Sequence, residues 1–378
     1  MRFVVSSHDL LQHLQSVSRV ISSKNSLPIL DDFLFHLEDN VLTITASDLE
    51  TTLVTQMTID NADEGGSIAL PALRLTNTLK EFPEEPLTFD IDLNTLSVEI
   101  TAEQGKYNIV GQRAVEYPQV PQLKEESKTV FKMDPGVLYN GITRTIFATA
   151  NDELRPIMNG IFFDIAEDAV TLVASDAHKL VRYIRKGMSI EKPGSFILPK
   201  KPASLLRNIL PKEEEEVTIE FDEKNARFVL SDHVLVCRLV EGSYPSYNSV
   251  IPQNNPNKLR VDRMSMMNAL KRVSVFSNQA SNLVRLTITG NKLTLSAQDL
   301  DFSVSASEWL NCEYEGDDME IGFKSTFLLE ILANLPGEEV IFELADPTRA
   351  GIILPAEQES EEDDLLMLLM PMMIGGVS

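Results

Sequence analysis

The sequence is poor in cysteine and in long apolar runs. Only two cysteines, Cys237 and Cys312, occur among 378 residues. Two thiols cannot build a disulfide framework or a cysteine-based metal site, so we expect both to be reduced and chemically inert. No stretch approaches the roughly 18 consecutive apolar residues of a membrane helix, and the first residues lack the apolar run of a signal peptide. These features predict a soluble, cytoplasmic protein.

Positive charge is also scarce. The chain has 33 Lys and Arg residues against 57 Asp and Glu, a formal net charge of −24. A conventional nucleic-acid-binding protein carries a basic footprint, and a strongly acidic one repels polyanions. If DNA is the partner, the positive charge must be confined to one surface.

The usual motifs of catalytic and cofactor sites are missing. The five histidines are His8, His13, His36, His178 and His233. Only the first two are close in sequence, and their separation of five misses the i,i+4 spacing of a helical metal site. A Walker phosphate loop, a dinucleotide fingerprint and a nucleophile elbow are all absent. We therefore expect no cofactor, no metal and no catalytic residue.

One short pattern is present three times. A strand with alternating apolar residues ends in Ala-x-Asp at Asp48, Asp176 and Asp299, which are 128 and 123 positions apart. A residue repeated in equivalent positions usually closes a turn, so we expect each carboxylate to accept backbone N–H groups. An alternative makes Asp176 and His178 the acid/base pair of a hydrolase or nuclease; it predicts metal dependence and loss of activity in Asp176→Asn.

Other landmarks keep the same interval. Helical runs begin at Leu70-Pro71, Leu198-Pro199 and Gly322-Phe323-Lys324 and end at Phe82-Pro83, Leu210-Pro211 and Leu335-Pro336, with the three prolines spaced by 128 and 125 positions. A further helical run precedes each Ala-x-Asp pattern, at residues 10–21, 137–148 and 264–275. Asp134-Pro135 is typical of a helix start, an N-cap followed by proline at the first helical position. A period near 125 residues is a domain length and is too long for a solenoid repeat.

The repeat predicts the fold class. We expect an α+β protein of three repeated domains, each with two helices packed on antiparallel sheets, because alternating strands need one covered face. The expected domains are residues 1–122, 128–253 and 254–378. An acidic segment, residues 357–364, is expected to be a solvated, mobile loop before a final apolar strand at residues 365–372.

Several short segments, in order along the whole chain, match one family. They are Leu27-Pro28-Ile29-Leu30, Ala46-Ser47-Asp48-Leu49-Glu50, Met158-Asn159-Gly160, Ala174-Ser175-Asp176-Ala177-His178-Lys179-Leu180, Tyr244-Pro245-Ser246-Tyr247 with Val250-Ile251-Pro252, Met319-Glu320-Ile321-Gly322-Phe323 and Met370-Pro371-Met372. Together they closely resemble the bacterial DNA polymerase III beta subunit, the replicative sliding clamp.

The resemblance implies a DNA clamp fold and a closed head-to-tail homodimeric ring that encircles duplex DNA without sequence specificity. It implies a non-catalytic processivity subunit that tethers the replicative polymerase. The implied partners are the polymerase III catalytic subunit, the clamp loader, other polymerases and repair proteins, with no membrane. It also accounts for the net charge, since only helices that line the ring need be positive. A protein-interaction scaffold without DNA is the remaining alternative; it would show no topological retention.

The resemblance also implies site residues. The DNA-facing residues would be Arg19, Lys24, Arg74, Arg144, Arg155, Lys200, Lys201, Arg207, Lys271 and Arg272. Asp152 and Pro156-Ile157 depart from the family, where some members have DNA-contacting polar and tyrosine residues. The dimer interface would include Tyr107, Ile109 and Val110 on one side and Val275 and Phe276 on the other, with edge strands pairing between chains.

A hydrophobic pocket for linear motifs of partner proteins is the other implied site. It would include Met158, Ser175, Ala177, His178, Lys179, Leu180, Pro245, Ser249, Val250, Leu368, Leu369, Met370, Pro371 and Met372. Flexible methionine and leucine side chains suit a site that accepts varied partners. Ser249 stands where members often have arginine, and the chain continues past Met372 as a longer tail able to lie over the pocket.

Overall fold

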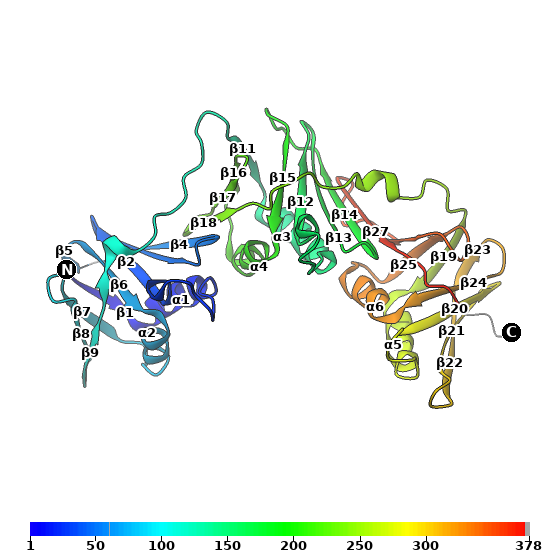
Figure 1. Cartoon of the computed structure of the whole chain (residues 1–378), viewed down its shortest axis with the longest axis horizontal. Helices are drawn as coiled ribbons and strands as arrows, with labels where there is room; N and C mark the ends of the chain where they lie inside the picture. Colours follow the sequence, from blue (N-terminus) through cyan, green and yellow to red (C-terminus); the bar gives the residue numbers. More distant parts are fainter. Residues whose placement is uncertain (60, 375–378) are drawn as a thin grey trace. The chain divides into compact units, whose positions relative to one another are not determined.

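The structure is a computed structural model that describes residues 1–59 and 61–374, with six α-helices and 27 strands in this part of the chain (Figure 1). It divides into two compact units. Unit 1 comprises Met1–Tyr139 and Lys201–Leu239, and unit 2 comprises Asn140–Lys200 and the chain from Val240 onward. Each unit combines a nine-stranded antiparallel sheet with a smaller one.

The large sheet of unit 1 has the order β10-β6-β2-β3-β4-β18-β17-β16-β11. Its strands are β2 (Asp32–Glu38), β3 (Val41–Ser47), β4 (Thr51–Thr58), β6 (Gly66–Pro71), β10 (Gln112–Arg113), β11 (Thr129–Met133), β16 (Val217–Phe221), β17 (Asn225–Val229) and β18 (His233–Arg238). The smaller sheet has the order β5-β1-β7-β8-β9. Its strands are β1 (Arg2–Ser6), β5 (Asn61–Glu64), β7 (Pro86–Asp92), β8 (Ser97–Thr101) and β9 (Lys106–Val110).

The large sheet of unit 2 has the order β15-β12-β13-β14-β27-β26-β25-β19-β23. Its strands are β12 (Gly160–Ile165), β13 (Ala169–Ser175), β14 (Lys179–Lys186), β15 (Gly194–Pro199), β19 (Asn257–Asp262), β23 (Glu313–Glu315), β25 (Glu339–Leu344), β26 (Gly351–Pro355) and β27 (Asp363–Leu369). The smaller sheet has the order β22-β21-β20-β24. Its strands are β20 (Leu283–Thr289), β21 (Lys292–Asp299), β22 (Val304–Asn311) and β24 (Met319–Lys324).

Two helices belong to each repeat. They are α1 (Ser7–Ser18) and α2 (Ala72–Leu79), α3 (Pro135–Thr145) and α4 (Lys200–Ile209), and α5 (Arg263–Ser274) and α6 (Ser325–Asn334). Helix α1 packs against α2 in unit 1, and α5 packs against α6 in unit 2. Three helices begin at side-chain caps: Asp9 N donates to Ser6 Oγ (3.3 Å), Val137 N to Asp134 Oδ1 (3.0 Å) and Ser265 N to Asp262 Oδ1 (2.7 Å). The predicted start at Asp134-Pro135 is confirmed.

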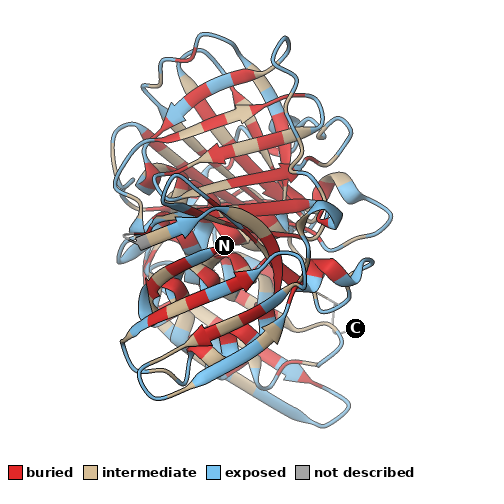
Figure 2. Ribbon diagram, turned by 90° about the vertical axis from the view of Figure 1, so that its left-hand side faces the viewer, coloured by how far each residue is buried: buried red, intermediate tan, exposed pale blue. Residues whose placement is uncertain are grey.

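Apolar stripes and alternating strands build the cores. Leu10, Leu14 and Val17 of α1 are buried at helical spacing, as the sequence predicts. Strand β3 buries Leu42, Ile44 and Ala46 on one face, and toward its end it also buries Thr45 and Ser47 on the other face. Figure 2 shows buried and exposed residues alternating along the strands.

The strands of the second repeat are divided between the two large sheets. Strands β11 and β16–β18 extend the sheet of the first repeat, and β12–β15 extend that of the third. The strand that follows the Ala-x-Asp turn makes each junction: β4 pairs with β18, and β14 pairs with β27, both antiparallel. Each junction joins this strand of one repeat to the last strand of the next.

The structure differs from the sequence predictions at several element ends. Leu70 and Pro71 belong to β6, so the second helix of the first repeat begins at Ala72 and ends at Leu79 rather than at Phe82. The segment Gly322-Phe323-Lys324 likewise ends β24 instead of beginning a helix. The final strand stops at Leu369, before Pro371.

The acidic segment is largely exposed, as expected of a solvated loop, but several of its acids have basic partners. Glu359 pairs with Arg144 (2.8 Å), Glu362 pairs with Arg185, and Asp364 pairs with Arg182 (3.2 Å). Asp363 accepts a hydrogen bond from Tyr183 Oη (2.7 Å). Basic residues of β14 and α3 therefore anchor this segment. Among the described helices, none has the length and apolarity to cross a membrane.

Candidate functional site

The three Ala-x-Asp motifs form turns closed by the aspartate. Asp48 Oδ1 accepts hydrogen bonds from the N–H groups of Glu50 (3.0 Å) and Thr51 (2.7 Å). Asp176 Oδ1 accepts them from His178 and Lys179, both at 2.9 Å, and Asp299 Oδ1 accepts one from Asp301 (3.0 Å). The predicted turn role is confirmed. Leu49 and Ala177, with φ of 77° and 72°, occupy the left-handed region in the first two turns.

The second turn does not form an acid/base pair. Asp176 Oδ2 pairs with Lys179 Nζ (2.7 Å), and the same ammonium pairs with Glu330 Oε2 (3.0 Å). The His178 ring lies 5.7 Å from the Phe327 ring, nearly parallel to it. Lys179 Nζ lies 4.2 Å from the centre of the Phe327 ring. Asp176 is thus committed to backbone N–H groups and a buried lysine, an arrangement that holds a turn against α6.

The structure brings most of the predicted pocket residues together within unit 2. Ser175 ends β13, residues 177–180 follow it, and β14 pairs with β27 so that Lys179 lies opposite Leu369 and Leu180 opposite Leu368. Met370 N donates to the carbonyl of His178 (2.9 Å), which ties the chain after β27 to the turn. Met158 lies in a short 3-10 helix at residues 156–158, and Ser249 and Val250 lie in another at residues 247–250.

The floor of this region is an apolar cluster. Leu180 and Leu368 are buried together with Val173, Ile251, Ala350, Ile352 and Leu366. Phe162, Tyr244 and Tyr247 pack on the cluster, and the rings of Phe162 and Tyr244 stack at 4.8 Å. Burial, followed by nearby Asp164, raises the pKa of Tyr247, whose hydroxyl donates to that carboxylate (3.0 Å). This hydrogen bond therefore holds the Tyr247 ring in place on the apolar cluster.

Pocket residues differ in exposure. Val250, Met370, His178 and Pro245 are exposed, whereas Leu369 is fully buried and lies outside the apolar cluster. Leu180 and Leu368 can act as a floor, and the exposed residues as a rim. The assignment of these residues to a partner pocket stays a prediction.

The chain after β27 does not end at the pocket. Met372 N donates to the carbonyl of Gly322 (2.8 Å), so the tail pairs with β24 at the edge of the smaller sheet. A Cβ atom at Gly322 would lie 2.8 Å from Met372 O and 3.0 Å from a side-chain carbon of Ile374. Glycine is therefore needed at this position for the tail to approach. Residues 375–378 lie outside the described residues.

The contribution of α6 to this region was not predicted from the sequence. Phe327, Lys324 and Glu330 surround the turn at His178 and Lys179, with Lys324 Nζ lying 4.6 Å from the Phe327 ring centre. Their only sequence signal is an aromatic residue and an acid in the first turns of the helix that follows Met319–Phe323. Ile352 was also missed, because a buried strand residue has no distinguishing signal.

The helices carry a charge opposite to that of the whole chain. The six α-helices contain eight Lys and Arg residues and only two acids, Asp9 and Glu330. Their formal charge is therefore +6, and the rest of the chain carries −30 of the total of −24. The helices are therefore net positive because they hold only two of the 57 acids, although most of the 33 Lys and Arg residues lie elsewhere.

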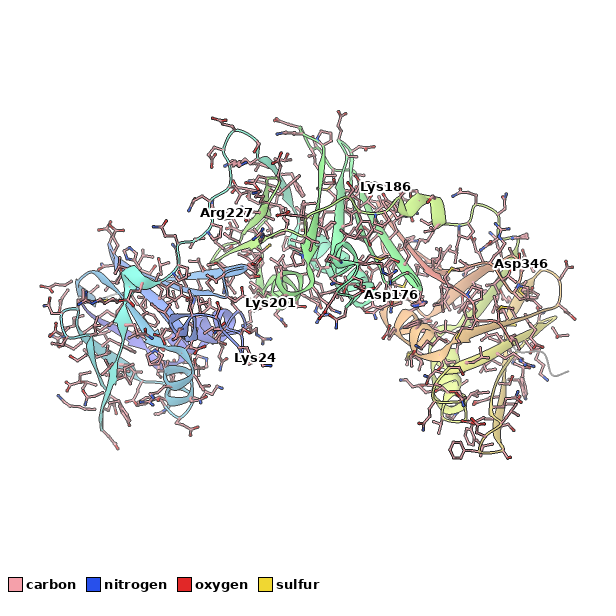
Figure 3. All side chains as sticks on the ribbon, in the orientation of Figure 1. Lys24, Asp176, Lys186, Lys201, Arg227 and Asp346 are labelled. Atoms are coloured by element: carbon pink, nitrogen blue, oxygen red, sulfur yellow. The ribbon has the colours of Figure 1, made fainter. Side chains whose placement is uncertain are left out.

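Most of the predicted DNA-facing residues are exposed. The exposed ones are Arg19, Lys24, Arg74, Arg155, Lys200, Arg207, Lys271 and Arg272. In Figure 3, Lys24 and Lys201 lie on the helix side of unit 1, whereas Arg227 lies on the strand side. Two residues have structural partners instead. Arg144 donates to Asn334 O (2.9 Å) and pairs with Glu359, and Lys201 Nζ pairs with Asp48 and donates to Val20 O (2.6 Å).

Two exposed arginines are held by acids. Arg155 pairs with Asp152 (2.8 Å), and this hydrogen bond lowers the pKa of Asp152. Arg272 pairs with Glu308 of β22, which lowers the pKa of Glu308. The ion pairs hold both guanidinium groups in place, and both side chains remain exposed to solvent.

Two long strands are open at sheet edges. Strand β9 ends the smaller sheet of unit 1, and β22 ends that of unit 2. Tyr107 and Val110 of β9 are exposed, as are Val304 and Trp309 of β22 and the neighbouring Val275 and Phe276. An exposed edge with apolar side chains is a site for pairing with another chain.

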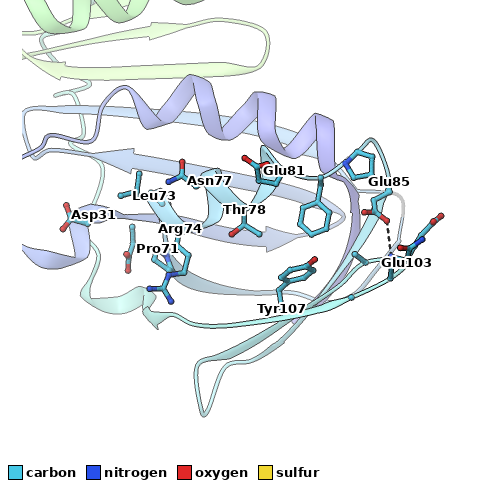
Figure 4. Close-up of a pocket in the computed structure, with 17 residues that line it drawn as sticks. Asp31, Pro71, Leu73, Arg74, Asn77, Thr78, Glu81, Glu85, Glu103 and Tyr107 are labelled. Atoms are coloured by element: carbon cyan, nitrogen blue, oxygen red, sulfur yellow. Dashed lines mark hydrogen bonds between the residues drawn. The ribbon is translucent and has the colours of Figure 1, made fainter.

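A groove of about 1380 Å³ lies beside β9 in unit 1. Figure 4 shows it between α2 and the β8–β9 hairpin, where Glu103 N donates to Glu85 (3.1 Å). Leu73, Phe82 and Tyr107 give it an apolar lining, with Phe82 and Tyr107 packed edge to face at 5.2 Å.

Among the described residues, no group of three potential metal ligands is close enough to hold an ion.

Models of the N-terminal, central and C-terminal domains of the DNA polymerase III beta subunit match residues 1–121, 132–246 and 248–373. The chain belongs to the DNA polymerase III beta subunit family. The beta sliding clamp of Haemophilus influenzae is 29% identical over 376 residues, which cover 98% of this chain and 100% of the relative.

Solved clamp structures match the fold over nearly the whole chain. The Pseudomonas aeruginosa clamp bound to griselimycin has a TM-score of 0.93 and 26% identity, covering 99% of this chain and 100% of that one. The clamp of Bartonella birtlesii bound to griselimycin has a TM-score of 0.90 and 28% identity, with the same coverage. The chain thus has the three-domain α+β clamp fold and the function of a sliding clamp, a processivity factor without catalytic activity.

Proposed function

We propose that two copies of this chain close into a head-to-tail ring through β22 of one copy and β9 of the other. The internal repeat supports this pairing. The strand after each Ala-x-Asp turn pairs with the last strand of the next repeat, as β4 with β18 and β14 with β27. Strand β22 follows the third turn, and β9 is the last strand of the smaller sheet of the first repeat, followed only by the two-residue β10 of the large sheet, so a second copy supplies the equivalent pairing. Contacts of this kind close a ring when the rotation between subunits closes.

The register follows from the same comparison. The first residue of β14, Lys179, lies opposite the last residue of β27, Leu369. The start of β22, Val304, would therefore lie opposite the end of β9, Val110, and both valines are exposed in the single chain. Apolar cross-strand pairs stabilise such a junction.

Phe276→Asp tests the joint. Phe276 and Val275 follow α5 next to β22 and are exposed, so a buried charge there would shift the protein toward monomer at low micromolar concentration. Sedimentation velocity measures the shift. The matched control is Leu154→Asp, an exposed apolar residue in a loop, which should remain dimeric. A dimeric Phe276→Asp protein would contradict this interface.

We propose that the helices face encircled duplex DNA. The observation that carries this is their charge of +6 in a chain of −24. A ring held by topology needs only weak attraction to phosphates, and that attraction decreases with salt. The test is retention on nicked circular plasmid after loading by the cognate loader, in gel filtration at moderate salt. Loss of the protein when the plasmid is linearised supports encirclement, and equal retention on both forms contradicts it.

Charge-reversal variants distinguish the contribution of the helices to DNA loading from that of the remaining surface. Arg207→Glu in α4 and Lys271→Glu in α5 replace exposed basic residues, so they should weaken loading and reduce its salt dependence. Lys132→Glu changes an exposed lysine on β11 and serves as the matched control. Equal defects in all three variants would mean that net charge, rather than helix charge, governs the DNA interaction.

We propose that the region around His178, Val250 and Met370 binds linear motifs of the replicative polymerase, the clamp loader and other partners. Its apolar floor and its exposed rim, which includes Val250 and Met370, support this function. Griselimycin is a suitable probe, because the solved clamps of two relatives hold it. Calorimetry should show binding that is lost in Val250→Asp and kept in Leu154→Asp. Binding that survives both changes would place the probe elsewhere. The protein would act in the cytoplasm, on the DNA.

A further inference from the structure

Each Ala-x-Asp turn contacts the second helix of the following repeat wherever one chain contains both. In unit 1, Asp48 pairs with Lys201, the second residue of α4. In unit 2, the ring of His178 lies 5.7 Å from Phe327, the third residue of α6, and Lys179 pairs with Glu330. The same two elements meet in both junctions, although the residues differ.

The third turn has no fourth repeat to contact, and the second helix of the first repeat has no preceding turn. Leu73 is the second residue of α2 and stands 128 positions before Lys201, the interval between Asp48 and Asp176. Leu73 is 76% exposed. Leu300 and Phe302 in the third turn are 78% and 76% exposed, whereas Leu49, the equivalent of Leu300 in the first turn, is 44% exposed.

We propose that Leu300 and Phe302 of one subunit insert into the groove beside α2 of the second copy, where they contact Leu73. This inference rests on the proposed ring, in which β22 follows the same turn and pairs with β9 at the edge of that groove. The groove is large enough for both side chains, and Phe82 and Tyr107 continue its apolar lining beyond Leu73 (Figure 4). Large exposed apolar side chains gathered on one loop are typical of an interaction site.

The charges and the internal hydrogen bonds of the third turn also favour a second copy of the chain as its partner. Asp301 and Arg74 are both exposed; each lies within two residues of the counterpart of Asp48 or Lys201, so an acid and a base are available for an ion pair across the subunits. Asp299 Oδ1 accepts the N–H of Asp301 (3.0 Å), and Asn278 Nδ2 donates to Asp299 Oδ2 (3.4 Å). The loop is thus held to the segment after α5 before it meets a partner, which lowers the entropy lost on binding.

Serine substitutions test the contact. Leu300→Ser and Phe302→Ser should each weaken a joint about tenfold, and because a ring has two identical joints, the dimer dissociation constant should rise about a hundredfold. Sedimentation equilibrium measures it. Leu49→Ser changes the equivalent position of the first turn, and Leu154→Ser changes another exposed leucine. Both controls should dissociate as the unaltered chain does. Unchanged dissociation of both test variants would overturn the proposal.

Cross-linking tests proximity without relying on stability. Cys237 and Cys312 are buried, so Leu73→Cys combined with Leu300→Cys adds the only exposed thiols among the described residues. Mild oxidation should give a covalent dimer from this chain and none from Leu73→Cys combined with Leu154→Cys. A monomeric unaltered chain would refute the ring itself. A dimer that Phe276→Asp dissociates, but that neither serine change nor oxidation affects, would refute only the insertion of the third turn.

Discussion

A pair of histidines should make stability depend on pH. His13 of α1 shares a hydrogen bond with Thr55 of β4 (2.7 Å), and His233 of β18 shares one with Ser16 (2.9 Å). The two rings are 6.4 Å apart at the junction between β4 and β18. Burial and the proximity of His13 lower the pKa of His233 from 6.5 to about 4, although Asp232 and Glu213 raise it. Burial lowers the pKa of His13 as well.

The sign of the effect follows from the direction of the shift. A histidine whose pKa is lowered in the folded protein favours the unfolded state once it is protonated, so its stabilising contribution is complete above about pH 6.5 and is lost toward pH 4. With a pKa of 6.5 in the unfolded chain and about 4 in the folded protein, His233 alone should lower the free energy of unfolding by about 2 kcal/mol when the pH falls from 7.5 to 5. Protonation of His13 acts in the same direction.

Urea denaturation at the two pH values, followed by circular dichroism, measures this loss. His233→Gln keeps a polar group near Ser16 and cannot titrate, so it should lose about 2 kcal/mol less than the unaltered chain between pH 7.5 and pH 5. His36→Gln replaces an exposed histidine on β2 and should behave as the unaltered chain. Equal losses for the unaltered chain and His233→Gln would refute the assignment of the pH dependence to this junction.

Two further changes test the region around the second turn. Lys179→Met leaves Asp176 and Glu330 without their shared ammonium, so the free energy of unfolding should fall by about 3 kcal/mol; Glu330→Gln should cost less than about 1 kcal/mol because that carboxylate is half exposed. Equal losses in urea denaturation would contradict a buried Lys179. Gly322→Val should displace the tail, since even a Cβ meets Met372 O at 2.8 Å; faster hydrogen exchange at the Met372 amide would show it, and unchanged protection would contradict it.

The repeat made the fold predictable. Three Asp residues at intervals of 128 and 123 positions predicted the three turns correctly, because closing a turn is a local interaction of a side chain with its own backbone. The intervals also placed the helices. Their exact starts were less predictable: Leu70-Pro71 and Gly322-Phe323 both end strands that precede a helix directly. A short apolar segment before a helix carries no signal that separates the two.

The candidate site was predictable only in part. The residues of the turn at His178 and of the tail at Met370 came from the resemblance, and the structure places them side by side. The contacts of Phe327 and Glu330 with that turn could not be predicted, since they depend on packing between repeats. The partners of Lys201 and Arg144 could not be predicted either. A basic residue on a helix has the same sequence signal whether it meets solvent, DNA or a neighbouring acid.

Residence on DNA and attraction to DNA depend on different parts of this molecule. In the proposed ring, circular DNA is released only when a joint opens, so residence time would depend on β9, β22 and the third turn. The helix charges act through phosphate contacts and counterion release, which change with salt. Weakening the joint through Leu300 should therefore shorten residence at every salt concentration, whereas Lys271→Glu should alter the salt dependence of loading and leave residence on circles unchanged. In the proposed ring, topology rather than net charge would retain a chain of −24 on DNA.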